Sequence, residues 1–214
     1  TALCVGPNID YVIVETYNKY SAKKINVLLA EARLAAYFKD QVTAQQMDEL
    51  EGGKKSSAYR VIKTLKGSDL LGLSYLQLFD IAKPEGRAFE ILNDNFVTTE
   101  DGTGVVHMAP CYGADDARIC LQAGIASLDI VDFNGYYKDI MGPFAGEAVK
   151  AEYLQEEVVS AQGFKSLDVK LVIDLKEREQ AFHAEKYLHS YPHCWRTDKP
   201  ILYFPLESWF IKTT

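Results

Sequence analysis

The spacing of apolar and polar residues predicts short strands with helices scattered between them. Residues 11–17 are rich in β-branched and aromatic side chains, which favours a strand. Residues 28–38 carry leucine and alanine on roughly one face, which is typical of a helix. The same reasoning predicts strands at 59–65, 88–92 and 105–108, a strand piece with a turn in 94–103, and helices at 114–123, 146–160 and 167–182.

Glycines and polar clusters mark the connections between these elements. Residues 51–57 read as a polar loop, and Gly67 opens a turn. The dipeptide Asn134-Gly135 is a strong hairpin signal. Gly163 separates the last two predicted helices.

The end of the chain differs in character from the rest. Residues 191–210 carry three prolines among aromatic side chains, which predicts an extended ribbon rather than a helix. The chain has no regular β-α-β alternation and no G-x-G-x-x-G motif. A nucleotide-binding parallel sheet is therefore not expected.

Composition and charge narrow the class of protein. Hydrophobic residues make up 48% and charged residues 25%, as in soluble globular proteins, and no apolar run is long enough to predict a membrane span. A formal net charge of -7 argues against a domain that grips nucleic acid mainly by its phosphates. The charge is still compatible with a domain that contacts only a few terminal nucleotides of a nucleic acid.

The cysteines and the first residues indicate the cellular setting. None of the four cysteines forms a C-x-x-C pair, which favours a reduced, cytoplasmic environment. The chain begins with Thr1 rather than methionine and has no signal-peptide pattern. We therefore expect a piece cut from a longer cytoplasmic protein.

A metal site is not predicted. His189, His193 and Cys194 are possible ligands, but no second C-x-x-C or H-x-x-x-H pattern completes a set of four. An aromatic turn of packed side chains is the preferred interpretation.

The segment around His107 has the pattern of a binding site. Gly102 and Gly104 flank Thr103 and allow the backbone to turn sharply and to approach a ligand closely. In the strand that follows, Val105 and His107 point to one side, and their neighbours point to the other. On residue type alone, a hydrogen-bonded strand histidine is the more common explanation for His107.

Two carboxylates follow this strand at the start of a predicted helix. Pro110 ends the strand, and Gly113 leads into Asp115 and Asp116. Carboxylates are favoured in a first helical turn by the helix dipole and the free N–H groups there. Either aspartate can therefore be a simple helix cap, and caps are common.

These residues resemble a known family motif. The string G-T-G-V-V-H-M-A-P at 102–110, followed by G-A-D-D at 113–116, resembles the editing-site signature of isoleucyl-tRNA synthetases, which lies in their connective polypeptide 1 insertion. The related valyl and leucyl enzymes lack the histidine. Further segments resemble the family in the same order along nearly the whole chain, at 66–80, 142–150 and 189–210.

The resemblance implies a fold and a domain division. The fold would be α+β and β-rich, with a distorted β-barrel core and peripheral helices. Residues 1–189 would be the editing domain, and residues 190–214 a β-ribbon that returns to a synthetic core outside this chain. The chain would be monomeric, with an unpaired strand edge open to self-association.

The resemblance also implies a reaction. The domain would hydrolyse the ester of valine mischarged on the isoleucine tRNA, binding its 3′-terminal adenosine, and valyl-adenylate is a further substrate. Editing would need no cofactor and no membrane. The parent enzyme would ligate isoleucine to tRNA with ATP and magnesium at a separate site.

Roles follow for the matched residues. Asp116 would bind the α-ammonium group of the substrate, and His107 would contact the terminal ribose and exclude the extra methylene of isoleucine, so both belong to the catalytic site. No carboxylate that would orient His107 as a general base is identifiable. Gly102, Thr103 and Gly104 would line the substrate-binding site. The Thr103 hydroxyl would contact substrate or only stabilise the turn, and Asp115 would support the site.

The chain departs from the family pattern at three places. A threonine-rich strand, T-T-P-W-T-L-P-x-N, comes just before the segment that matches residues 1–3 in the family, and it is absent here. Thr197 replaces the second cysteine of a C-W-R-C zinc motif, and Gln77 stands where relatives often carry proline.

Two alternatives remain at this stage. One is a valyl-tRNA synthetase editing domain that hydrolyses threonine esters. The other is a catalytically incomplete fragment that binds aminoacyl-adenosine.

Overall fold

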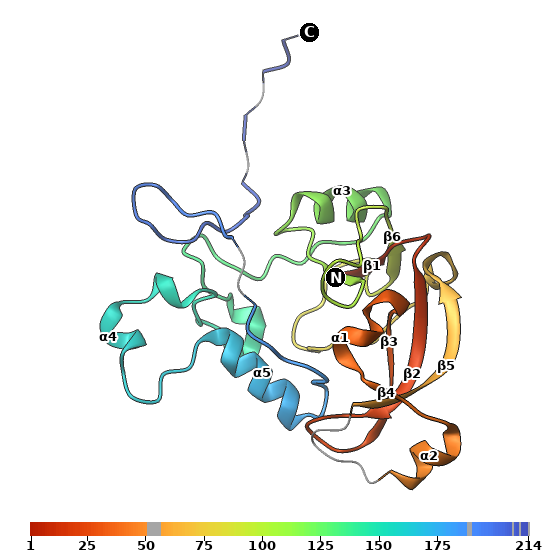
Figure 1. Ribbon diagram of the computed structural model, residues 1–214. Coiled ribbons are helices and arrows are strands. Elements are labelled where there is room, and N and C mark those ends of the chain that lie inside the picture. The colour runs from red at the N-terminus through yellow and green to blue at the C-terminus, as the bar shows by residue number, and fades with distance from the viewer. Residues whose placement is uncertain (51–56, 188–189, 207, 210, 214) are drawn as a thin grey trace.

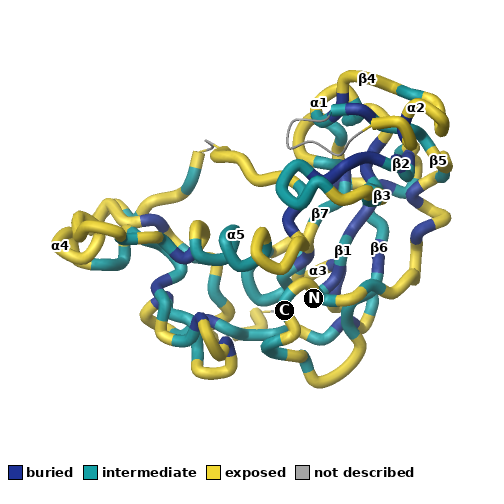
Figure 2. Tube along the Cα trace, turned by 90° about the horizontal axis from the view of Figure 1, so that it is seen from below, coloured by how far each residue is buried: buried dark blue, intermediate teal, exposed yellow. Residues whose placement is uncertain are grey.

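The computed structural model describes residues 1–214 except 51–56, 188–189, 207, 210 and 214. The described residues form two lobes (Figure 1). The first lobe carries both β-sheets and helix α3 (Ala114–Gln122), and the second carries helices α4 (Glu156–Val159) and α5 (Leu167–Glu177). Figure 2 shows that α5 lies nearer to the sheets than α4 does.

A four-stranded sheet is built around strand β2 (Asp10–Tyr17). Strand β2 pairs antiparallel with β3 (Lys24–Ala30) and with β5 (Ala58–Lys66), and the short β4 (Asp40–Gln41) pairs with β5. Most of β2 is buried, which explains its run of β-branched and aromatic residues. The strands predicted at 11–17 and 59–65 are confirmed.

A three-stranded sheet holds the segment with the family motif. Strand β1 (Ala2–Val5) lies between β6 (Ile91–Asn93), which is parallel to it, and β7 (Val105–Met108), which is antiparallel. Helix α3 covers this sheet, and its predicted position is confirmed. The buried side chains between sheet and helix include Ala2, Cys4, Leu92, Met108, Ile119 and Cys120.

The two sheets are joined at the turn that precedes β7. The buried Tyr11 hydroxyl donates a hydrogen bond to the Gly104 carbonyl at 2.6 Å and accepts one from the Gly6 N–H at 3.0 Å. The Ala30 N–H donates to the Thr103 carbonyl at 2.8 Å. Gly104 has φ of 75°, and a Cβ there would lie 2.6 Å from the Cβ of Ala30, so only glycine fits.

The α+β class is confirmed, and the described residues contain similar amounts of helix and strand. Their two sheets stay open, so the expected distorted barrel is not found as a closed barrel among them. Strand β3 and the turn before β7 are linked by the backbone hydrogen bond from Ala30 to Thr103, but β3 and β7 belong to different sheets and form no common ladder.

The helix predicted at 28–38 is only partly correct. Its first three residues complete β3, because they pair with residues 11–13 of β2. Helical backbone starts later, in the 3₁₀ turn η1 (Glu31–Arg33) and helix α1 (Leu34–Tyr37). Tertiary pairing has overridden an apolar spacing that fitted a helix.

Other boundaries shift where single residues leave the expected conformation. Strand β6 begins after position 88 because Phe89 has φ of 60°, a left-handed conformation unsuited to a strand. The segment 94–103 forms no strand. The helix predicted at 146–160 is reduced to η4 (Ala151–Tyr153) and α4, with Gly146 at φ of 73°. Helix α5 ends before the predicted position 182, just ahead of Glu179 at φ of 59°.

Several elements were not predicted, among them strands β1 and β4 and the first part of β3. Helix α2 (Ala44–Glu49) starts with a capping box in which Thr43 and Gln46 exchange hydrogen bonds. The 3₁₀ turn η2 (Gly67–Leu70) lies where a turn was predicted, and η3 (Asp139–Phe144) lies where no element was predicted. Of the predicted polar loop at 51–57, residues 51–56 lie outside the described residues.

The second lobe has its own core of Met141, Phe144 and Leu167. The predicted hairpin at Asn134-Gly135 is confirmed as a turn, closed by a bridge between Val131 and Tyr137. The predicted C-terminal ribbon is limited, in the described part of 191–210, to one bridge between His193 and Pro200. Among the described residues, no helix is long and apolar enough to cross a membrane.

The junction between the sheets can be tested by Tyr11→Phe. This change leaves a buried donor on Gly6 and a buried acceptor on Gly104 without their shared partner. It should lower the free energy of unfolding by about 1–3 kcal/mol, measured by urea denaturation. The exposed Tyr203→Phe is the control and should leave stability unchanged. Equal stability of both variants would contradict the role given to Tyr11.

Candidate functional site

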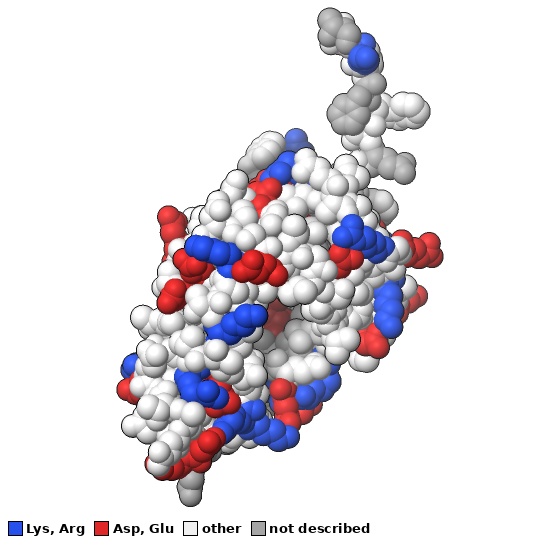
Figure 3. Space-filling model, turned by 90° about the vertical axis from the view of Figure 1, so that its right-hand side faces the viewer, with Lys and Arg blue, Asp and Glu red and all other residues white. Residues whose placement is uncertain are grey.

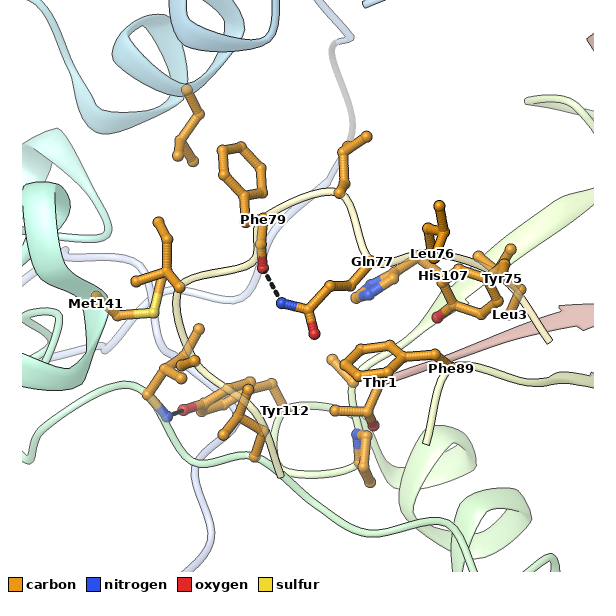
Figure 4. Close-up of a pocket in the computed structure, with 18 of the residues that line it drawn as sticks. Thr1, Leu3, Tyr75, Leu76, Gln77, Phe79, Phe89, His107, Tyr112 and Met141 are labelled. Carbon is orange, nitrogen blue, oxygen red and sulfur yellow. Dashed lines mark hydrogen bonds between the residues drawn. The ribbon is translucent and has the colours of Figure 1, made fainter. Parts of the chain in front are cut away.

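A cavity of about 560 Å³ lies between the two lobes (Figure 4). Strands β1 and β7 supply one wall through Leu3 and His107, and the second lobe supplies another through Met141 and Leu171. The segment 75–82, which has no helix or strand of its own, forms a third wall. The size is within the range of small-molecule sites, roughly 300–1,000 Å³.

The cavity walls are mostly apolar and aromatic. Polar side chains are few, and among them are His107, Gln77 and Thr1. A small number of polar groups in an apolar cavity is typical of ligand sites, because these groups orient a ligand that the walls hold. The aromatic lining residues are Tyr75, Phe79, Phe89, Tyr112 and Tyr137.

His107 faces this cavity as the predicted alternation of β7 requires. Met108 is fully buried in the core under α3, whereas His107 pairs with Leu3 on the cavity side. Although His107 stays exposed on one side, partial loss of water against the cavity wall lowers the pKa of its imidazole, and the nearby Thr1 ammonium lowers it too. The Asp116 carboxylate opposes this shift. The imidazole is therefore neutral at pH 7.

Asp116 lies beside the cavity rather than in its lining. It sits in the first turn of α3, and its Oδ2 accepts a hydrogen bond from the Ala109 N–H at 2.7 Å. Ala109 and Pro110 line the cavity, so Asp116 fixes the wall next to His107. A Cβ on Gly113 would come within 2.9 Å of the Asp116 carboxyl carbon, so glycine there permits this position.

Neither aspartate caps α3 by a side-chain hydrogen bond. Asp116 turns back to the end of β7, and Asp115 is exposed and meets Arg118 at 3.4 Å. The simple helix-cap interpretation is therefore wrong for both residues, although both lie in the first turn.

The residues 102–104 lie at the opposite end of β7 from Asp116. Gly102 and Gly104 have φ of 58° and 75°, as expected for a sharp turn. Arg33 donates to the Gly102 carbonyl at 2.8 Å. The Thr103 hydroxyl accepts a hydrogen bond from the Val105 N–H at 3.4 Å, within its own turn. These residues do not line the cavity, and their part in substrate binding stays a prediction.

Tyr112 was not singled out from the sequence, yet its ring is a fixed part of the cavity wall. Its hydroxyl donates to Asp129 at 2.9 Å and accepts from the N–H groups of Ile130 and Val131 at 2.8 and 2.9 Å. Lys138 holds the other oxygen of Asp129 at 2.6 Å. Burial, followed by the hydrogen bond to Asp129, raises the pKa of Tyr112, while the bonds from Ile130 and Val131 oppose this only in part, so the hydroxyl stays protonated.

The histidines and cysteines form no metal-binding group among the described residues. His193 contacts the Tyr191 carbonyl at 2.9 Å through Nδ1. Cys194 and His193 lie in the turn closed by the bridge to Pro200, and His189 lies outside the described residues.

Comparisons with known proteins connect this geometry to a family. No family model matches the chain. The whole chain is 45% identical to isoleucine–tRNA ligase from Cytophaga hutchinsonii and 42% identical to that from Bacteroides fragilis, covering 21% of each. It is 35% identical to isoleucine–tRNA ligase from Clostridium tetani, covering 17%. The chain thus spans about a fifth of the length of the curated relatives it matches.

The electrostatic coupling at the site can be tested by NMR titration of His107. Its midpoint should lie below the ordinary value of about 6.5. Asp116→Asn keeps an oxygen to accept from Ala109 but removes the charge, so the midpoint should fall further. Asp115→Asn is the matched control and should leave it unchanged. A midpoint that rises in Asp116→Asn would refute the coupling.

Proposed function

The chain is homologous over its whole length to part of the isoleucine–tRNA ligases, and from this relationship we propose that it is their editing domain. The proposed reaction is hydrolysis of the ester between valine and the 3′-terminal adenosine of the isoleucine tRNA. The observation that carries the proposal is a mostly apolar cavity in which His107 faces inward and Asp116 supports the adjoining wall.

The need for such a reaction follows from a limit on binding. A hydrophobic site sized for isoleucine also accepts valine, since the missing methylene changes the binding free energy only modestly. The isoleucine–valine pair is itself the well-known example of this limit. A second site that admits the smaller product and hydrolyses it restores accuracy.

The cavity has the chemistry that a valine ester requires. Apolar walls can hold a branched side chain, and the His107 imidazole, whose pKa is lowered by partial desolvation, offers a hydrogen bond at the edge of these walls. We assign to His107 contact with the terminal ribose and exclusion of the additional methylene of isoleucine.

Asp116 is the proposed partner of the substrate ammonium group. One carboxylate oxygen is used by Ala109, while the other makes no hydrogen bond within the described residues. Aminoacyl esters are activated, so a water molecule held beside the carbonyl suffices and no covalent nucleophile is required.

The charge distribution agrees with contact to only the end of a tRNA. Acidic and basic side chains are interspersed on the face shown in Figure 3, and the formal net charge is -7. We propose that other parts of a longer ligase hold the body of the tRNA and join isoleucine to it with ATP and magnesium. Valyl-adenylate is a second proposed substrate.

The role of Asp116 is tested by Asp116→Asn, assayed for loss of valine from valylated isoleucine tRNA. Removing the charge should slow hydrolysis by about tenfold or more, because a charge-assisted hydrogen bond to the amine is lost. Asp115→Asn is the control and should hydrolyse at the normal rate. Normal rates in Asp116→Asn would reject this assignment.

The role of His107 is tested with isoleucyl-tRNA. His107→Ala should allow its hydrolysis to rise by about tenfold, because the side chain that crowds the extra methylene is removed. Val106→Ala alters the opposite face of β7 and should not affect the ratio of valyl to isoleucyl hydrolysis. Unchanged resistance of isoleucyl-tRNA in His107→Ala would show that another residue excludes it.

Binding of the ester without turnover by the unmodified chain would favour the binding-only alternative.

A further inference from the structure

Two buried polar atoms in the cavity have no hydrogen-bond partner among the described residues. They are the amide oxygen Oε1 of Gln77 and the hydroxyl Oγ1 of Thr1. Most buried polar atoms in folded proteins are paired, so each unpaired one needs an explanation. Their occurrence in the same cavity points to a ligand that supplies the missing partners.

The orientation of the Gln77 amide is determined by its neighbours. The amide nitrogen donates to the Phe79 carbonyl and to Asp80 Oδ1 at 3.3 Å. The opposite orientation would place an oxygen against these two acceptors, which is unfavourable. Oε1 therefore points away from Phe79 towards the centre of the cavity (Figure 4).

The walls around these two atoms suit a flat ring. Tyr75 and Phe89 pack edge to face with ring centroids 5.9 Å apart, and Tyr112 is fixed by its hydrogen bonds. Phe89 keeps its left-handed backbone because its N–H donates to the Thr1 carbonyl at 2.7 Å and its carbonyl accepts from Tyr75 at 2.8 Å. This strained position places the Phe89 ring in the cavity lining.

We propose that Gln77 is a specificity residue that reads the edge of a 6-aminopurine. Oε1 accepts a hydrogen bond from the exocyclic amino group, the Thr1 hydroxyl donates to a neighbouring ring nitrogen, and the aromatic walls contact the ring faces. A 6-oxopurine is rejected because its oxygen would face the Gln77 oxygen. The inference rests on the proposed function, in which the terminal adenosine supplies the purine.

The test compares how tightly three nucleosides bind to the 214-residue chain. Each binding curve is measured by NMR titration. Adenosine should bind about fivefold or more tightly than purine riboside, which lacks the amino group, and inosine should bind most weakly. Gln77→Met, similar in size, should bind adenosine and purine riboside equally. Gln45→Met alters an exposed glutamine and should keep the original ranking.

The inference can be overturned with the unmodified chain alone, so the test does not depend on whether Gln77→Met folds. Absence of nucleoside binding, or equal binding of the three nucleosides by the unmodified chain, overturns the inference, as does an unchanged ranking in a folded Gln77→Met. Selectivity for adenosine without hydrolysis of valyl-tRNA would support the purine site and reject editing. Hydrolysis of valyl-tRNA without selectivity for adenosine would support editing and reject the purine site.

Discussion

The arrangement of the cavity depends on two hydrogen bonds of the Tyr11 hydroxyl. It lies in the core, where it bonds Gly104 before β7 and Gly6 after β1. These two bonds align the three-stranded sheet with the larger one and fix where β7 begins. Because side chains alternate along a strand, that starting point decides that Met108 enters the core and His107 faces the cavity.

The far end of β7 is fixed by a carboxylate instead of a ladder partner. Asp116 bonds the Ala109 N–H and thereby places Ala109 and Pro110 in the cavity wall. The same carboxylate acts on the charge of His107. Structure and electrostatics at this site are therefore coupled, which is why substitutions that retain an acceptor at 116 are more informative than truncation.

Local features of the first lobe could be predicted from the sequence, and long-range ones could not. The period of β7 and the acidic first turn of α3 follow from residues 102–116 alone. The bond from Asp116 back to Ala109 needed the loop geometry that Gly113 allows. Residues 28–30 satisfied a helical spacing, but their pairing with β2 decided the outcome.

The cavity as a whole had no sequence signal. Its third wall, 75–82, shows no helical or strand period, and the sequence gives no sign that the oxygen of Gln77 lies unpaired in the cavity. The capping box at Thr43 was a readable signal that was missed. Packing between distant segments, which no local pattern encodes, determined the rest.

The parallel pairing of β1 with β6 has a consequence for how the site forms. Residues about ninety positions apart must meet before this pair exists, and the cavity adds walls from beyond position 140. Contacts of such long sequence separation form slowly, because closing large loops costs chain entropy before any contact compensates for it. The site is thus a product of late folding, and its appearance during refolding reports that both lobes have reached their native arrangement.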